Sequence, residues 1–270
     1  MAEMGPGLRR ESAAGANRSI AMKNSGTIRV GIGGWVFPPW RGAFYPPGLR
    51  QAEELAYASR HVSAIEINGT FYRIQTPASF KKWRDETPDD FVFSLKAPRF
   101  LTHRAELASA EPYLARFFAS GLLDLGNKLG PILWQFAATK QFDDADLAAF
   151  LKLLPGEIGG RRLRHVIEAR HKSFSAPAII DLLREHGVAL AQVDDVHYPE
   201  FAEATADFLY LRLRRCAEDE PTGYPPDARD RWAEQARNWA AEGRDVFLYF
   251  INGAKIRAPA AAQALIQRLE

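Results

Sequence analysis

The run Phe208-Leu-Tyr-Leu-Arg-Leu-Arg214 alternates leucines with Tyr210, Arg212 and Arg214, which is the two-residue period of a β-strand. Similar short runs recur along the chain, at Ile28–Gly33, Ala64–Asn68, Phe91–Lys96, Ile132–Phe136, His165–Arg170, Ala189–Asp194 and Val246–Asn252. Helical patterns separate them, at Gln51–Arg60, Pro77–Glu86, Ala110–Leu125, Asp144–Leu153, Ala176–His186, Asp227–Glu242 and Pro259–Leu269. Eight strands alternating with helices predict a single α/β domain, a (β/α)8 or TIM barrel with a long aromatic loop after the first strand. A doubly wound open sheet with extra strands is the alternative.

Composition limits the classes of protein that fit. The 270 residues are 47 % hydrophobic and 25 % charged, which excludes wholesale disorder. Thirty-five Lys and Arg against 33 Asp and Glu give a net charge of +2, too little for a broad nucleic-acid surface. The single cysteine, Cys216, cannot form an internal disulfide, which fits the cytoplasm. No apolar run is long enough to span a membrane.

The beginning of the chain differs from the rest. Residues 1–26 are rich in Gly, Ala, Ser and Asn and show no hydrophobic period, so we predict a flexible leader there. We assign residues 27–270 to the barrel domain.

Polar side chains occur near the carboxyl ends of the predicted strands. Residues i and i+2 share a face of a strand, and on this basis we place one set on a common face: Glu66, Asn68, Ser94, Lys96, Gln135, Glu168, Arg170, Gln192, Asp194, Arg212 and Asn252. If that face points inward, these groups converge at the top of the barrel, where TIM-barrel enzymes have their active sites.

Glu66, Glu168 and Lys96 are the candidate catalytic residues. The two glutamates lie on strands that are three apart, so we expect them across the barrel mouth as a general acid and base. The alternative is that each forms a structural ion pair with Lys96 or a nearby arginine. Lys96 is a candidate for Schiff-base formation if burial or neighbouring cations lower its pKa; otherwise it binds an anion or forms an ion pair.

A collar of cations predicts an anionic ligand. It comprises Lys96, His103, Arg170, His171, Arg212 and Arg214. Guanidinium groups suit phosphate or carboxylate, although balancing Glu66, Glu168 and Asp194 is the alternative role. Asn68, Gln135 and Asn252 are candidates to orient the ligand. Trp35 and Tyr72 are candidates to stack on it, unless these loop aromatics simply pack against the barrel.

We predict no metal site and no cofactor. Glu66, Glu168, Asp194, His103 and His171 are permissible ligands, but no His-x-His or His-Glu-x-x-His pattern is present.

Several motifs resemble the domain-of-unknown-function 72 family, the YecE-like proteins. They include Gly31-Ile-Gly-Gly-Trp35, Glu66-Ile-Asn-Gly-Thr-Phe-Tyr72, Phe91-Val-Phe-Ser-Leu-Lys-Ala97 and Glu168-Ala-Arg-His171. The resemblance implies a (β/α)8 barrel and no established reaction. This chain departs from the family pattern where Arg214-Arg215 replaces the usual His-Gly and where Ile251 replaces an Asn.

These observations favour an enzyme acting on a phosphate-bearing small molecule or nucleic-acid fragment. A non-catalytic nucleic-acid-binding module and a metal-dependent sugar isomerase or phosphodiesterase are the alternatives. No membrane partner is expected, and the sequence leaves the oligomeric state open.

Overall fold

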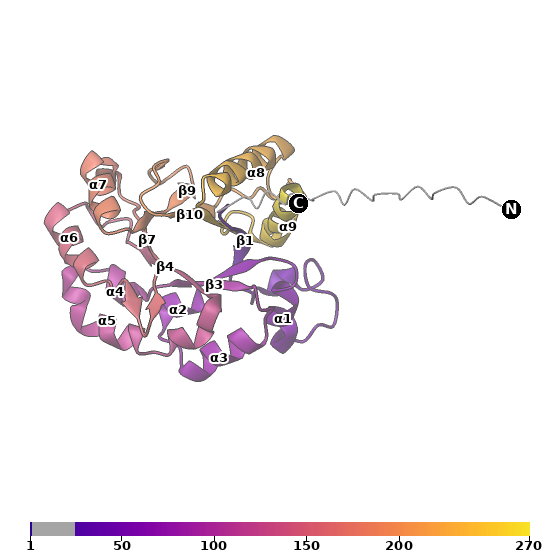
Figure 1. Cartoon of the computed structure of the whole chain (residues 1–270), viewed down its shortest axis with the longest axis horizontal. Helices are drawn as coiled ribbons and strands as arrows, with labels where there is room; N and C mark the ends of the chain where they lie inside the picture. The colour runs from indigo at the N-terminus through magenta and orange to yellow at the C-terminus, as the bar shows by residue number, and fades with distance from the viewer. Residues whose placement is uncertain (2–24) are drawn as a thin grey trace.

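The computed structural model describes Met1 and residues 25–270, and its strands form a barrel surrounded by helices (Figure 1). The parallel strands run in the order β8-β7-β4-β3-β2-β1-β11-β10-β9. Their bounds are β1 Ile28–Gly33, β2 Ala64–Ile67, β3 Val92–Lys96, β4 Leu129–Gln135, β7 His165–Glu168, β8 Ala189–Leu190, β9 Gln192–Asp194, β10 Phe208–Leu213 and β11 Asp245–Phe250.

The two end strands of this sheet close the barrel. β8 pairs with β7 and β9 pairs with β10, and only Ala191 separates β8 from β9 along the chain. The Ala191 N–H donates to the carbonyl of Ile167 in β7, at 2.8 Å. Segment 189–194 therefore acts as one barrel strand interrupted at a single residue, and the predicted (β/α)8 barrel is confirmed.

Helices cover the outside of the barrel (Figure 1). They are α1 Glu54–Ala58, α2 Gly69–Tyr72, α3 Pro77–Asp85, α4 Arg99–Thr102, α5 Glu111–Phe118, α6 Asp144–Lys152, α7 Pro177–Glu185, α8 Pro226–Ala241 and α9 Ala258–Leu269. The local sequence explains where two helices begin. The side chains of Thr76 and Asp143 cap α3 and α6, respectively, by accepting hydrogen bonds from backbone N–H groups. A small antiparallel hairpin, β5 Glu157–Ile158 with β6 Arg161–Arg162, precedes β7.

Two apolar clusters show which face of each strand points inward. The larger cluster lies between strands and helices and includes Ile65 and Phe93. The smaller one fills the barrel and includes Ala64, Val166 and Tyr210. Because side chains alternate, the inner cluster places the predicted polar ends of β2, β3, β4, β7 and β10 inside the barrel.

The inward assignment was wrong for two of the eight predicted strands. Ala189, Ala191 and Val193 belong to the inner cluster, so Gln192 and Asp194 take the opposite face. Directly after β11, Ile251 belongs to the inner cluster, whereas Asn252 is exposed with a left-handed φ of +57°. Residues 246–251 are apolar on both faces, as parallel strands buried on both sides commonly are, so alternation gave no signal there. In Ala189–Asp194 the polar Gln192 and Asp194 do share one face, but the small apolar face is the one that points into the barrel.

The aromatic loop after β1 is packed against the barrel. The indole N–H of Trp40 donates to the carbonyl of Lys255 at 2.9 Å, and the Tyr45 hydroxyl donates to the carbonyl of Trp35 at 2.6 Å. Trp35 meets Trp83 edge-on, with ring centroids 5.3 Å apart, and joins the outer cluster. The structure thus places Trp35 away from the barrel interior, against the expectation that it stacks on a ligand.

Most of the predicted leader lies outside the described residues. Gly26 is an exception: its N–H donates to the carbonyl of Ala240 at 2.8 Å. Within the described chain, no helix combines the length and apolar character needed to cross a membrane.

Candidate functional site at the carboxyl ends of the strands

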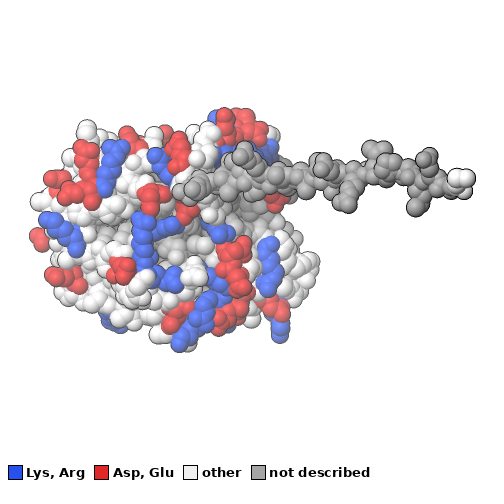
Figure 2. Space-filling model, in the orientation of Figure 1, with Lys and Arg blue, Asp and Glu red and all other residues white. Residues whose placement is uncertain are grey.

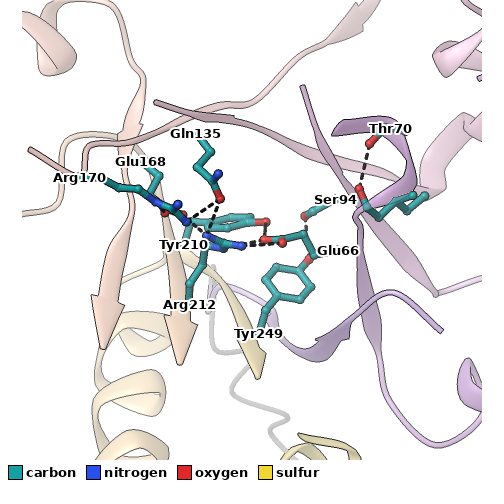
Figure 3. Close-up of polar contacts among 10 residues, drawn as sticks. Glu66, Thr70, Ser94, Gln135, Glu168, Arg170, Tyr210, Arg212 and Tyr249 are labelled. Atoms are coloured by element: carbon teal, nitrogen blue, oxygen red, sulfur yellow. Dashed lines mark hydrogen bonds and ion pairs between the residues drawn. The ribbon is translucent and has the colours of Figure 1, made fainter. Parts of the chain in front are cut away.

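Arg212 of β10 lies at the centre of a buried polar network in the barrel (Figure 3). Its Nε and Nη2 donate to the two carboxylate oxygens of Glu66, each at 2.9 Å. Its Nη1 donates to a carboxylate oxygen of Glu168 and to Gln135 Oε1, the latter at 3.2 Å. The Tyr210 hydroxyl donates to Glu66 at 2.9 Å. Every guanidinium nitrogen of Arg212 therefore has a protein acceptor.

Arg170 extends this network toward the rim. Its Nε donates to Glu168 Oε1 at 2.5 Å, and its Nη2 donates to Gln135 Oε1 at 2.8 Å. Gln135 and Glu168 are register partners in β4 and β7, which explains why one amide oxygen serves both arginines. The Nη1 of Arg170 has no hydrogen-bond partner among the described residues, and 16 % of the side chain is exposed.

The two glutamates are bridged by one guanidinium group, and this arrangement favours the ion-pair interpretation. Burial acts to raise the pKa of Glu168, but Arg212 and Arg170 outweigh it and lower that pKa to about 2. Such a carboxylate holds no proton to donate near neutral pH. We therefore assign Glu168 the role of positioning the arginines, and Glu66 shares that role through its paired contacts with Arg212.

Lys96 differs from its neighbours because no described carboxylate lies within ion-pair distance of it. The side chain is 7 % exposed, and its Nζ lies 4.1 Å from the ring centroid of Phe71. Burial, followed by the charge of Arg212, lowers the pKa of Lys96 to about 8. Three basic side chains thus meet two carboxylates, and one positive charge in the cluster remains unpaired.

His103 and Tyr72 lie at the rim above this network. The His103 ring meets Phe71 edge-on at 5.5 Å, and its pKa is lowered by burial and then by Arg170 and Arg99. Tyr72 is 68 % exposed and lies 6.0 Å from the Arg99 guanidinium carbon. Positive charge therefore lies close to His103 on this part of the rim, and the exposed Tyr72 lies beside it.

Other predicted site residues have different partners. Asp194 pairs with Arg215 at 2.8 Å and accepts from the Tyr224 hydroxyl at 2.7 Å. His171 caps the short helical turn after β7 by contacting Ser173. Asn252 is exposed beyond β11. Asn68 directly precedes α2, and its amide lies beside Gly33 of β1 near Ile251 of the inner cluster, so it faces the barrel interior without joining the Arg212 network.

Tyr198 is a rim residue that the sequence analysis missed. The guanidinium carbons of Arg170 and Arg214 lie 4.8 and 5.0 Å from its ring centroid. Arg214 is also 3.2 Å from a carboxylate oxygen of Asp195. Tyr198 belongs to the irregular segment between β9 and β10, where no period indicates the direction of a side chain.

The metal-binding side chains and the surface charge bear on two of the alternative functions, a metal-dependent enzyme and a nucleic-acid-binding module. The described residues hold no group of three or more His, Cys, Asp or Glu side chains placed to bind a metal ion. On the face shown in Figure 2, basic and acidic side chains are interspersed. Neither feature favours the metal-dependent alternative or a broad nucleic-acid surface.

The fold and this network define a parallel (β/α)8-barrel protein with a charged cluster at the carboxyl ends of its strands. The model of the family described as "Protein of unknown function DUF72" matches residues 29–270, and the chain belongs to that family. A DUF72 family protein from Thermotoga maritima has a similar structure, with a TM-score of 0.73 and 21 % identity over 90 % of this chain and 99 % of the other.

Two relatives are similar in sequence over part of the chain. The UPF0759 protein YecE of Escherichia coli K12 is 32 % identical over 152 residues, 55 % of this chain and 50 % of YecE. The UPF0759 protein YunF of Bacillus subtilis 168 is 30 % identical over 156 residues, 56 % of this chain and 53 % of YunF. The similarity thus spans about half the length of each relative.

Proposed function

We propose that this protein is an enzyme acting on a phosphate-bearing small molecule bound above Lys96 and Arg170. The observation that carries the proposal is the unpaired positive charge of Lys96 inside a barrel mouth. A buried charge without a partner is costly, and an anionic ligand would compensate it.

The remaining donors suit a phosphate group. Arg170 keeps Nη1 without a described protein partner, and the positive charges of Lys96 and Arg99 lie near enough to affect His103. Arg212, which we expected to contact the ligand directly, instead orders Glu66, Glu168 and Gln135 beneath this region. We therefore assign Arg212 a positioning role and give direct contact with the phosphate to Arg170, with the positive charges of Arg99 and Lys96 nearby.

Catalysis is favoured over simple binding because the Nζ of Lys96 has no hydrogen-bond or ion-pair partner among the described residues, and burial lowers the pKa of its amine to about 8. A pKa of about 8 lets its amine exchange a proton under physiological conditions, as a general acid or base must. Paired, permanently charged cations would suffice for binding alone.

Isothermal titration calorimetry with inorganic phosphate, phosphosugars, nucleotides and short oligonucleotides tests the proposal. Arg170→Lys should weaken phosphate binding about ten- to a hundred-fold, since a charge-assisted hydrogen bond contributes about 1.5–3 kcal/mol and the planar fork is lost. Arg184→Lys, at an exposed pair on α7, is the matched control and should bind normally. If no anion binds at millimolar concentration, the cations serve only the buried carboxylates and the proposal fails. Preferential oligonucleotide binding with a steep salt dependence and no turnover would instead support a nucleic-acid-binding module.

A further inference from the structure

We propose that Lys96 forms a covalent imine with the carbonyl carbon of a phosphate-bearing aldehyde or ketone. This inference rests on the proposed function, since it assigns the phosphate to Arg170 and Arg99 and the carbonyl group to Lys96. Lys96 is the last residue of β3, at the carboxyl end where barrel enzymes hold reacting groups.

A second buried lysine shows what a structural role looks like in this protein. Lys128 is 7 % exposed, the same fraction as Lys96. Its Nζ donates to the carbonyls of Arg84 and Thr87, at 2.5 and 2.7 Å, and to the Thr87 hydroxyl at 3.2 Å. All three ammonium hydrogens of Lys128 are therefore used.

The Nζ of Lys96 has no such partners in the described part of the chain. It has neither a hydrogen bond nor an ion pair there, and its aromatic contact is the face of Phe71. Some polar atoms in the described chain are sealed from solvent and have no hydrogen-bond partner, but Lys96 Nζ is not one of them. The nitrogen therefore keeps some contact with solvent. The Lys96 side chain is thus mostly buried, while its nitrogen keeps its hydrogen-bonding capacity for a small reactant.

The surroundings of Lys96 lower its pKa, which increases the fraction of the neutral amine, the form that attacks a carbonyl. Burial and the charges of Arg212 and Arg170 lower the pKa of Lys96, and together they outweigh Glu66 and Glu168, which act to raise it.

The reaction balances without an oxidant or reductant. The nitrogen lone pair forms the bond to the carbonyl carbon, and the carbonyl oxygen takes up two protons and leaves as water. Overall, the ammonium group and the carbonyl compound give a protonated imine and one water molecule. The positive charge stays on the nitrogen, where it can withdraw electrons from a neighbouring carbon–carbon or carbon–hydrogen bond.

Borohydride trapping of the full-length protein tests this proposal directly. Pyridoxal 5′-phosphate serves as the probe because it carries an aldehyde and a phosphate; pyridoxal lacks the phosphate, and 4-deoxypyridoxine 5′-phosphate lacks the aldehyde. After reduction, peptide mass spectrometry should find the adduct on Lys96 and none on Lys128. Labelling should rise with pH around a midpoint of about 8, and pyridoxal should require a concentration about ten-fold higher or more.

Two variants separate the covalent step from anion binding. Lys96→Arg keeps a positive charge but cannot form an imine, so it should lose the adduct while still binding the deoxy phosphate. Lys152→Arg, at an exposed position in α6, should label like the wild type. Because the adduct is mapped on the wild type, the result does not depend on whether Lys96→Arg folds.

Two outcomes distinguish the proposals. If the deoxy phosphate binds but the reduced label is found only on exposed lysines, the imine proposal is overturned and the proposed function stands. If pyridoxal and its phosphate label Lys96 equally well, imine formation is supported and the phosphate part of the proposed function fails.

Discussion

Replacing Glu66 with Gln should destabilise the barrel severely while leaving the shape of the side chain unchanged. In the wild type, both carboxylate oxygens accept from Arg212 at 2.9 Å, and one of them also accepts from the Tyr210 hydroxyl. In Glu66→Gln, one oxygen becomes an NH2 group, so a donor faces other donors. The number of unpaired positive charges in the buried cluster rises from one to two.

The size of the loss in unfolding free energy follows from the burial of both Glu66 and Arg212. The Glu66 side chain is 0 % exposed and that of Arg212 is 4 % exposed, so water cannot replace the lost acceptor. Removing one member of such a buried pair costs about 3–5 kcal/mol. At about 2–4 °C per kcal/mol for a domain near this size, the melting temperature should fall by roughly 6–20 °C.

Urea unfolding followed by circular dichroism, together with thermal melts, would measure this loss. Asp207→Asn is the control, because it removes one charge from an exposed bidentate pair with Arg162, a type that contributes about 0.2–1 kcal/mol. If Glu66→Gln costs no more than Asp207→Asn, the network does not stabilise the barrel as described and the reasoning is refuted.

Three further predictions concern acid stability, close packing and the start of the chain. The folded pKa of Glu168, about 2, lies below its ordinary value of 4.5, so its stabilising effect is complete above pH 4.5 and is lost as the pH falls toward 2. Urea midpoints should therefore fall more steeply over that window in the wild type than in Glu168→Gln, and equal slopes would contradict the assignment. Gly31→Ala should destabilise the folded protein by about 1–3 kcal/mol, because the added Cβ would lie 2.1 Å from the Ala64 carbonyl oxygen. Gly156→Ala is the control: its Cβ would meet no atom within 4 Å, so the melting temperature should change little. Removing residues 1–24 should leave the thermal melt unchanged, because that segment has no hydrophobic period and the cut retains the Gly26 hydrogen bond; a drop of many degrees would show that the segment supports the barrel.

The sequence was sufficient to predict the barrel and most of the inward-facing polar groups. Alternation in β10 separates Leu211 from Tyr210 and Arg212, and the same rule places Glu66 and Lys96 correctly. These are local properties, because the period of a strand fixes which side chains share a face. In β11 the run is apolar on both faces, so the side of Asn252 could not be read from its composition.

Only the tertiary structure decided which charges pair. From the sequence, Arg170 and Arg212 are equivalent candidates for an anion, yet Arg212 is surrounded by protein acceptors and Arg170 keeps one nitrogen free in the described structure. Lys96 ends β3 and Lys128 directly precedes β4, and the two lysines are equally buried. Lys128 meets three acceptors within hydrogen-bond distance, whereas Lys96 faces an aromatic ring. Hydrogen bonds and ion pairs depend on differences of about 1 Å between atoms distant in the chain, so periodicity places a residue on a face but does not determine its partner.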